Sequence, residues 1–206
     1  GTGLITVAAN QVLTIGSLNN PGNRKIFDST ASGAKVLFQK GAVKEINIAW
    51  WVGNTSGANI TDALSEALES VNTNQGIIHV PTGQWLSSGG HIVAGGVTIE
   101  GEGNFVSAGY GTSIKLSSPS TTYLFKIGEG EFSIRFEKIL LDGTVTTSKV
   151  GVYMTGQCPN TSGDILFKKV TFLTFNNGFE IFSDDVTGPP VCNGWQVAQV
   201  KFDTCI

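Results

Sequence analysis

A short apolar pattern recurs in the second half of this chain at a nearly constant interval. Three segments align without gaps: FEKILLD at 136–142, FKKVTFL at 167–173 and VAQVKFD at 197–203. The intervals between successive copies are 31 and 30 residues. In each copy an apolar residue is followed two positions later by another, as at Ile139 and Leu141. Such a repeat predicts coils that stack with equivalent apolar positions above one another.

The rest of the second half favours short strands. From residue 76 onward apolar and polar residues alternate with period two, in runs such as VTIE at 97–100 and YLFKI at 123–127. Only 14% of the residues are charged, and 79 of the 206 are Gly, Ser, Thr or Asn, which is typical of a turn-rich chain. We therefore predict an all-β fold, a solenoid of the parallel β-helix type. A β-sandwich whose strands merely resemble one another is the alternative.

One segment departs from the strand pattern. Between residues 60 and 71 the apolar side chains recur at helical spacing, at Ile60, Ala63, Leu64, Ala67, Leu68 and Val71. Thr61 can cap the N-terminus of such a helix, and Asp62 is well placed against the helix dipole. The open end of a β-helix exposes unpaired strand edges and the ends of its apolar ladders. We expect this one N-terminal helix to cover that end.

The chain divides into two predicted parts. Residues 1–48 hold short alternating runs separated by Asn-, Gly- and Ser-rich turns, which indicate a small β subdomain. Residues 49–206 form the predicted β-helix, with Trp50, Trp51 and the polar stretch 53–59 at the boundary. The third repeat copy stops before the turn that follows the second copy. We therefore expect these residues to be the N-terminal part of a longer polypeptide.

Several motifs resemble those of a known family. The segments NITDALSEALESV at 59–71, GIIHVPTGQW at 76–85 and GVTIEGEG at 96–103 are similar to the helix and first rungs of pectate-lyase-like right-handed β-helices. Upstream, KIFD at 25–28 and VLFQKG at 36–41 resemble the region that precedes this helix in bacteriophage tailspikes. The stretch 54–59 departs from the GAKGDG that many relatives carry. The resemblance otherwise covers nearly the whole chain.

The resemblance implies both a fold and a function. It implies a right-handed parallel β-helix in a homotrimeric tailspike of the virion, with residues 1–48 toward a tail or baseplate protein. Such a spike binds a bacterial surface polysaccharide and depolymerises it outside the cell. A non-catalytic receptor-binding spike is one alternative, and a secreted bacterial pectate-lyase-type enzyme is another.

Candidate catalytic groups come from paired carboxylates, because glycoside cleavage uses one carboxylic acid and one carboxylate. In the repeat alignment Asp142 and Asp203 share an outward column two rungs apart, roughly 9.6 Å, at the upper edge of the inverting range. The alternative is that Asp142 belongs to a turn and Asp203 is solvated. Asp184, in the SDD run at 183–185, weakly resembles the paired aspartates of polygalacturonases, and a plain acidic loop is the alternative.

Candidate sugar-binding groups are aromatic. Trp195 and Tyr110 could offer flat apolar faces to sugar rings, whereas Trp50 and Trp51 are expected to pack between the two parts of the chain. The two histidines, His79 and His91, and the three cysteines, Cys158, Cys192 and Cys205, form no recognisable zinc set. We expect structural roles for both histidines, and neither a metal nor a cofactor.

Charge and hydropathy indicate which partners are not expected. The net charge is −3, and the basic residues form no cluster beyond pairs such as Lys168 and Lys169, so nucleic acid is not an expected partner. No stretch approaches the roughly 18 consecutive apolar residues of a membrane helix. Insertion into a membrane is therefore not expected either.

Overall fold

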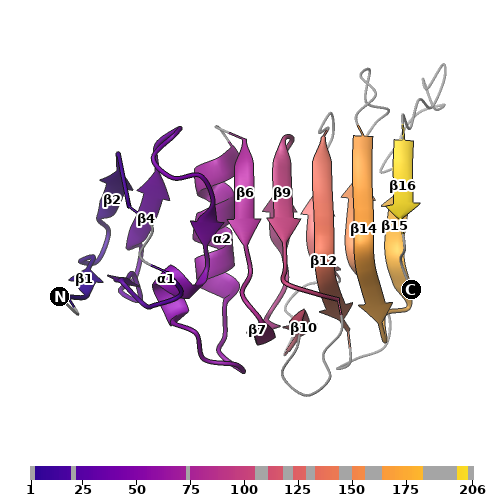
Figure 1. Cartoon of the computed structure of the whole chain (residues 1–206), viewed down its shortest axis with the longest axis horizontal. Coiled ribbons are helices and arrows are strands. Elements are labelled where there is room, and N and C mark those ends of the chain that lie inside the picture. Colours follow the sequence, from indigo (N-terminus) through magenta and orange to yellow (C-terminus); the bar gives the residue numbers. More distant parts are fainter. Residues whose placement is uncertain are drawn as a thin grey trace.

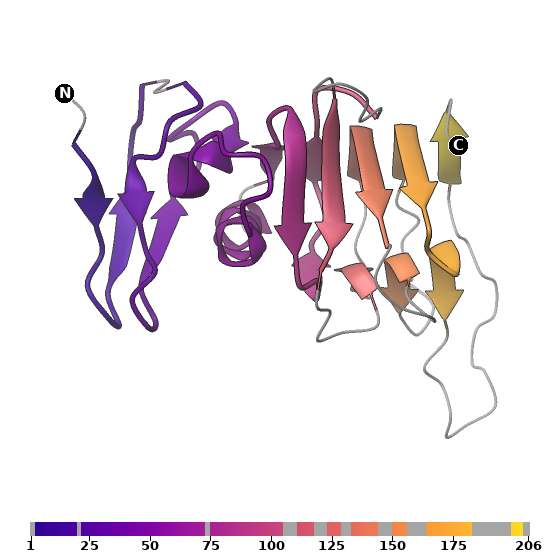
Figure 2. The same cartoon turned by 90° about the horizontal axis from the view of Figure 1, so that it is seen from below.

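The computed structural model describes residues 3–19, 22–72, 75–104, 111–117, 123–128, 133–143, 150–155, 164–182 and 199–203. These residues are mostly β, with parallel sheets, and their layers follow one another along the long axis in chain order (Figures 1 and 2). Their elements are β1 (Ile5–Thr6), β2 (Val12–Ile15), β3 (Phe27–Asp28), β4 (Lys35–Phe38), β5 (Ile46–Asn47), α1 (Ala49–Val52), α2 (Thr61–Asn72), β6 (Gly76–His79), β7 (Gly83–Ser87), β8 (His91–Val93), β9 (Val97–Glu100), β10 (Thr112–Leu116), β11 (Tyr123–Ile127), β12 (Ile134–Asp142), β13 (Val150–Thr155), β14 (Asp164–Leu173), β15 (Asn177–Phe182) and β16 (Gln199–Asp203).

Two large sheets contain the strands that follow α2. The eight-stranded sheet runs in the order β16-β14-β12-β9-β6-β5, and in it β10 pairs with β12 and with β7. The four-stranded sheet runs in the order β15-β13-β11-β8. Along the chain, one or two strands of the eight-stranded sheet are followed by one strand of the four-stranded sheet. Each new strand lies parallel to its equivalent in the preceding layer. Period-two strands with no helix between them, predicted from residue 76 onward, are confirmed for the described residues.

Strands β12 and β14 each occupy two positions of the eight-stranded sheet. The first half of β12 pairs with β9, and its second half pairs with β10. Between the halves Lys138 takes a left-handed conformation with φ of 54°, and Lys169 does the same at the equivalent point of β14. The corresponding residue of the preceding layer is Gly101, where an added Cβ would lie 2.5 Å from the carbonyl oxygen of Lys138. The backbones of the two layers therefore lie very close together at this turn.

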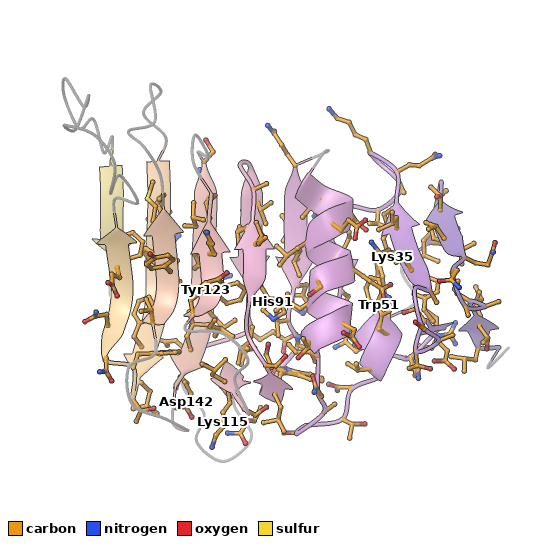
Figure 3. The ribbon with its side chains drawn as sticks, turned by 180° about the vertical axis from the view of Figure 1, so that it is seen from behind. Lys35, Trp51, His91, Lys115, Tyr123 and Asp142 are labelled. Carbon is orange, nitrogen blue, oxygen red and sulfur yellow. The ribbon has the colours of Figure 1, made fainter. Side chains whose placement is uncertain are left out.

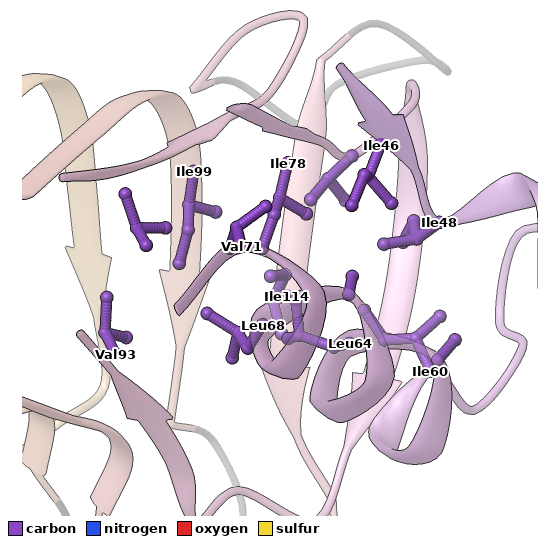
Figure 4. Packing of buried hydrophobic residues seen from close by; sticks show 14 of the residues in the cluster. Ile46, Ile48, Ile60, Leu64, Leu68, Val71, Ile78, Val93, Ile99 and Ile114 are labelled. Carbon is purple, nitrogen blue, oxygen red and sulfur yellow. The ribbon is translucent and has the colours of Figure 1, made fainter. Parts of the chain in front are cut away.

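The strand register stacks the inward side chains into a ladder in the eight-stranded sheet. Successive partners are Ile46, Ile78, Ile99, Phe136 and Phe167, all of them buried. The rings of Phe136 and Phe167 lie nearly parallel, with centroids 5.3 Å apart. Figure 4 shows the start of this ladder, in which Ile46, Ile78 and Ile99 follow one another beside α2. Burial of these side chains is the main favourable term in holding layer on layer.

The predicted repeat is confirmed for one interval and wrong for the other. Phe136 lies opposite Phe167 and Leu141 opposite Phe172, as the 31-residue interval requires. Phe202, however, lies opposite Phe167 and not opposite Phe172. The cause is the double length of β14, which carries the pattern apolar-x-Phe twice, as ILF at 165–167 and VTF at 170–172. The segment VKF at 200–202 matches both, and only the first is its neighbour in space.

Helix α2 confirms the predicted helix over 60–71. Its apolar side chains Ile60, Ala63, Leu64, Ala67, Leu68 and Val71 are buried. Thr61, the predicted cap, is the first residue of the helix, and its hydroxyl oxygen accepts the N–H of Ser88 at 2.9 Å. Its own N–H is donated to Oδ1 of Asn59 at 2.9 Å. The helix packs against β6, β8 and β9 on one side and β4 on the other (Figure 1). It therefore joins two stacks of strands.

The stack on the N-terminal side of α2 repeats the parallel arrangement at smaller scale. Strand β1 pairs with β3, and β2 pairs with β4, both in parallel. The buried residues Trp50 and Trp51 close this stack, with their rings 5.5 Å from Phe38 and 5.7 Å from Phe27 respectively. Trp51 also donates its indole N–H to Glu66 of α2, so the expected packing between the two parts of the chain is confirmed for Trp51. One hydrophobic cluster runs from these residues into both large sheets.

A buried carboxylate connects α2 to β4. Glu66 is 6% exposed, and its oxygens accept three hydrogen bonds, from the Ser29 hydroxyl at 2.7 Å, the Val36 N–H at 2.7 Å and the Trp51 indole N–H at 2.9 Å. One turn later, the Ser70 hydroxyl oxygen accepts the N–H of Phe38 at 3.2 Å. These two side chains take the place of a neighbouring strand along the edge of β4 that faces the helix.

Replacing Glu66 by Ala should lower the free energy of unfolding by about 3–5 kcal/mol, because two buried donors and one half-buried donor lose their acceptor. Urea titration monitored by circular dichroism measures the change. Glu69→Ala is the matched control on the same helix. Glu69 pairs with Lys35 at 2.8 Å on an open surface, and its removal should cost less than about 1 kcal/mol. Equal effects of the two substitutions would contradict the role given to Glu66.

Candidate functional site

A column of ionisable side chains runs along the outer surface of the eight-stranded sheet. From β9 onward these layers share the pattern apolar-x-apolar-ionisable, and in β6 Gly76 takes the first position of the pattern. The register places the ionisable residues opposite one another: His79, Glu100, Glu137, Lys168 and, by backbone register, Asp203. We call this set the ionisable column. The first four side chains are partly exposed, on the face opposite the buried ladder. This arrangement was not predicted from the sequence, although gap-free alignment of VTIE at 97–100 with IRFE at 134–137 would have found it.

Glu100 is held by a lysine from the next layer. The ammonium group of Lys138, at the left-handed turn of β12, lies 2.5 Å from Oε1 of Glu100. The hydrogen bond and the charge of Glu100 raise the pKa of Lys138 above its ordinary value. This ion pair keeps the Glu100 carboxylate in one place beside Glu137.

A second carboxylate, Glu102, lies beside the first residue of the column. Its Oε1 is 3.0 Å from Nε2 of His79, and its Oε2 accepts hydrogen bonds from the backbone N–H and the hydroxyl of Thr82. Partial burial alone would raise the pKa of Glu102, but the hydrogen bonds from Thr82 and His79 outweigh burial and lower it. Glu102 therefore acts as an anion that ties the β9 layer to the β6 layer.

The part of the column best suited to catalysis is its pair of adjacent carboxylates. Glu100 and Glu137 are direct partners on neighbouring parallel strands, whose backbones are about 4.8 Å apart. Retaining glycosidases hold their two carboxyl groups about 5–5.5 Å apart. A pair on adjacent layers can thus approach this separation, whereas a pair two layers apart cannot.

The predicted pairing of Asp142 with Asp203 is wrong in register. Asp142 lies opposite Lys115 and Leu173, whereas Asp203 lies opposite Lys168, in the ionisable column. Asp142 is 6% exposed, and its Oδ1 accepts a hydrogen bond from the Thr174 hydroxyl at 2.7 Å. The error follows from the mistaken 30-residue interval. Of the other candidates, Asp184, Trp195 and Tyr110 lie outside the described residues.

The outer surface of the four-stranded sheet carries an aromatic pair. The rings of Tyr123 on β11 and Tyr153 on β13 are stacked, with centroids 5.7 Å apart and planes 9° from parallel. The register places Tyr153 in one column with Ile92, Lys126 and Glu180. Figure 3 shows Tyr123 on this sheet, seen from behind. We call these five residues the tyrosine face.

Histidine 91 has a structural environment, as predicted. It is 2% exposed, and its ring lies over Phe125 with centroids 5.6 Å apart. Its Nε2 is 2.7 Å from the Ser87 hydroxyl, which also accepts the N–H of Gly89, and its Nδ1 is 3.2 Å from the Ser65 hydroxyl of α2. These contacts fit a neutral ring that accepts at Nε2 and donates at Nδ1. Burial lowers the pKa of His91 from 6.5 to about 4.

The described part of the chain contains cavities, but it contains neither a metal-binding cluster nor a membrane-spanning helix. Within it, no three His, Cys, Asp or Glu side chains come together to hold a metal ion. None of its helices has the length and hydropathy needed to cross a bilayer. A cavity of about 370 Å³ lies in the N-terminal stack, lined by residues such as Lys44 and Trp50, and another of the same volume lies between that stack and α2, lined by residues such as Ser29 and Asp62. Neither includes a residue of the ionisable column.

Comparison with known proteins adds no relative. No family model matches the sequence, and no curated protein or solved structure matches it either.

Histidine 91 should make the fold sensitive to acid. Its folded pKa lies below the unfolded value, so the unfolded chain binds more protons between these values and stability falls as the pH drops from about 6.5 to 4. The loss over this range should be about 3 kcal/mol. Urea unfolding of the protein and of His91→Gln at several pH values between 4 and 7 measures it. The variant should show a flatter pH dependence, and identical slopes would refute the assignment.

Proposed function

We propose that this chain belongs to a tailspike-like right-handed parallel β-helix that binds a bacterial surface polysaccharide and cleaves it. The stacked parallel strands, the buried ladder and α2 beside the first layers support the β-helix. The resemblance of the segments at 59–71, 76–85 and 96–103 to pectate-lyase-like proteins supports the class of ligand. A homotrimer on a phage tail, acting outside the host cell, is part of the same proposal and rests on the resemblance alone.

The observation that carries the proposal is the pairing of Glu100 with Glu137 on adjacent strands. In the proposed reaction Glu137 donates a proton to the leaving glycosidic oxygen while the Glu100 carboxylate, paired with Lys138, attacks the anomeric carbon. Water then attacks the glycosyl-enzyme ester and gives its proton to Glu137, which releases the sugar and restores both groups. The expected outcome is retention of configuration at the anomeric carbon.

A second candidate function is glycan binding without cleavage, by a structural or receptor-binding spike. The first four side chains of the ionisable column are partly exposed on the outer face of the sheet. The column therefore offers a surface, whereas enzymes usually enclose their reacting groups and exclude water. This observation favours a surface that recognises a glycan and leaves it intact.

Incubation with a panel of purified bacterial capsular polysaccharides and O-antigens separates the two functions. The protein should release new reducing ends from at least one polysaccharide, and Glu137→Gln should lower the rate by 10²-fold or more, since a positioned acid contributes 10²–10⁴-fold. Glu69→Gln, which changes an exposed carboxylate on α2, should leave the rate unchanged.

The products identify the outcome that contradicts the proposal. Binding of a polysaccharide with no new reducing ends would support the non-catalytic spike. Unsaturated sugar ends would indicate a lyase, and the displacement chemistry assigned to Glu100 and Glu137 would then be wrong.

A further inference from the structure

We propose that the tyrosine face is a glycan-binding site, separate from the ionisable column. The two surfaces lie on different sheets, since the column belongs to the eight-stranded sheet and the tyrosine face to the four-stranded sheet. This inference rests on the proposed function and gives it a place where the polysaccharide is held. A binding site away from the reacting groups can supply binding energy to orient a long chain.

The side chains of the tyrosine face combine apolar surface with polar groups at its margins. Ile92 is 59% exposed, although it lies in the middle of a strand whose two neighbouring side chains are buried. Tyr123 and Tyr153 are partly exposed and add two parallel rings. Lys126 and Glu180 occupy the same column as Ile92 and Tyr153, and Glu180 accepts a hydrogen bond from the Asn177 amide at 2.9 Å.

This combination fits a sugar chain. A pyranose ring has one apolar face of C–H groups, which can pack on aromatic and aliphatic carbon, and a rim of hydroxyl groups. Phenolic, ammonium, carboxylate and amide groups around the apolar surface can donate to and accept from that rim. Ligand sites generally share this plan of apolar surface with a few polar groups that fix orientation.

The dimensions of the face also fit an extended chain. Its column passes from Ile92 through Lys126 and Tyr153 to Glu180, across four neighbouring strands. At about 4.8 Å per strand it extends roughly 14 Å along the stack. A glycan lying along the stack would therefore meet apolar and polar positions in turn over several sugar units.

The alternative occupants fit less well. A stable contact with a second copy of the chain needs about 800 Å² on each partner and an apolar centre. Here the strands are three to six residues long, and Lys126 and Glu180 interrupt the column. Nucleic acid is also disfavoured, because Glu180 offsets Lys126 and the net charge is −3.

The test measures binding of the same polysaccharide panel to immobilised protein, in the Glu137→Gln background so that no ligand is consumed. Tyr153→Ala should weaken binding at least tenfold, whereas Tyr153→Phe, which keeps the ring, should stay within about threefold. Ile92→Ser should also weaken binding. Because Ile92 is exposed, this variant should fold normally, and it tests the site even if Tyr153→Ala fails to fold. Leu173→Ser is the matched control, since Leu173 is 44% exposed on the other sheet, and it should bind normally.

Two results would contradict the inference, and only the second would also contradict the proposed function. If the parent protein binds a polysaccharide and both Tyr153→Ala and Ile92→Ser bind it equally well, the tyrosine face is not the site, while the proposed function stands. If the parent protein binds nothing on the panel, the proposed function fails and the site fails with it.

Discussion

The hydrogen bonds between backbones of neighbouring layers are the interaction on which this structure depends. The strand on one side of a parallel strand pairs with only half of its N–H and C=O groups. The groups along its other edge need a second partner. Most strands after α2 find that partner in the next layer. At α2 the regular succession is interrupted, and there Glu66 and Ser70 accept the N–H groups of Val36 and Phe38. Two helix side chains thus accept backbone N–H groups of β4 that would otherwise be buried without a partner.

The same register has opposite consequences on the two faces of a sheet. On the inner face it places Ile99, Phe136 and Phe167 in contact and so builds the core. On the outer face it places Glu100 and Glu137 side by side, where like charges repel unless a cation or a ligand intervenes. Lys138 supplies the cation from the turn of β12. The residues of the candidate site come one position after the core residues on each strand. The same strand register therefore aligns both sets.

Local patterns in the sequence predicted the elements well, and long-range neighbours less well. The helical spacing from Ile60 to Val71 and the alternation after residue 76 depend on near neighbours in the chain, and both were found. The partner of Phe202 was misassigned because β14 contains two equivalent matches, and only tertiary packing chooses between them. The neighbours Glu100 and Glu137 are separated by 37 residues, an interval outside the detected repeat. The stacking of Tyr123 on Tyr153 depends on ring geometry that no spacing encodes.

The unequal intervals between layers have a consequence for how such a protein can change. By backbone register, Ile78 is followed by Ile99, 21 residues later, then by Phe136 after 37, Phe167 after 31 and Phe202 after 35. The strands keep their alignment although the length of chain between them nearly doubles. Evolution or an engineer can therefore lengthen, shorten or exchange the connecting segments while the strands stay in place. The scaffold and the surface it displays can be varied independently.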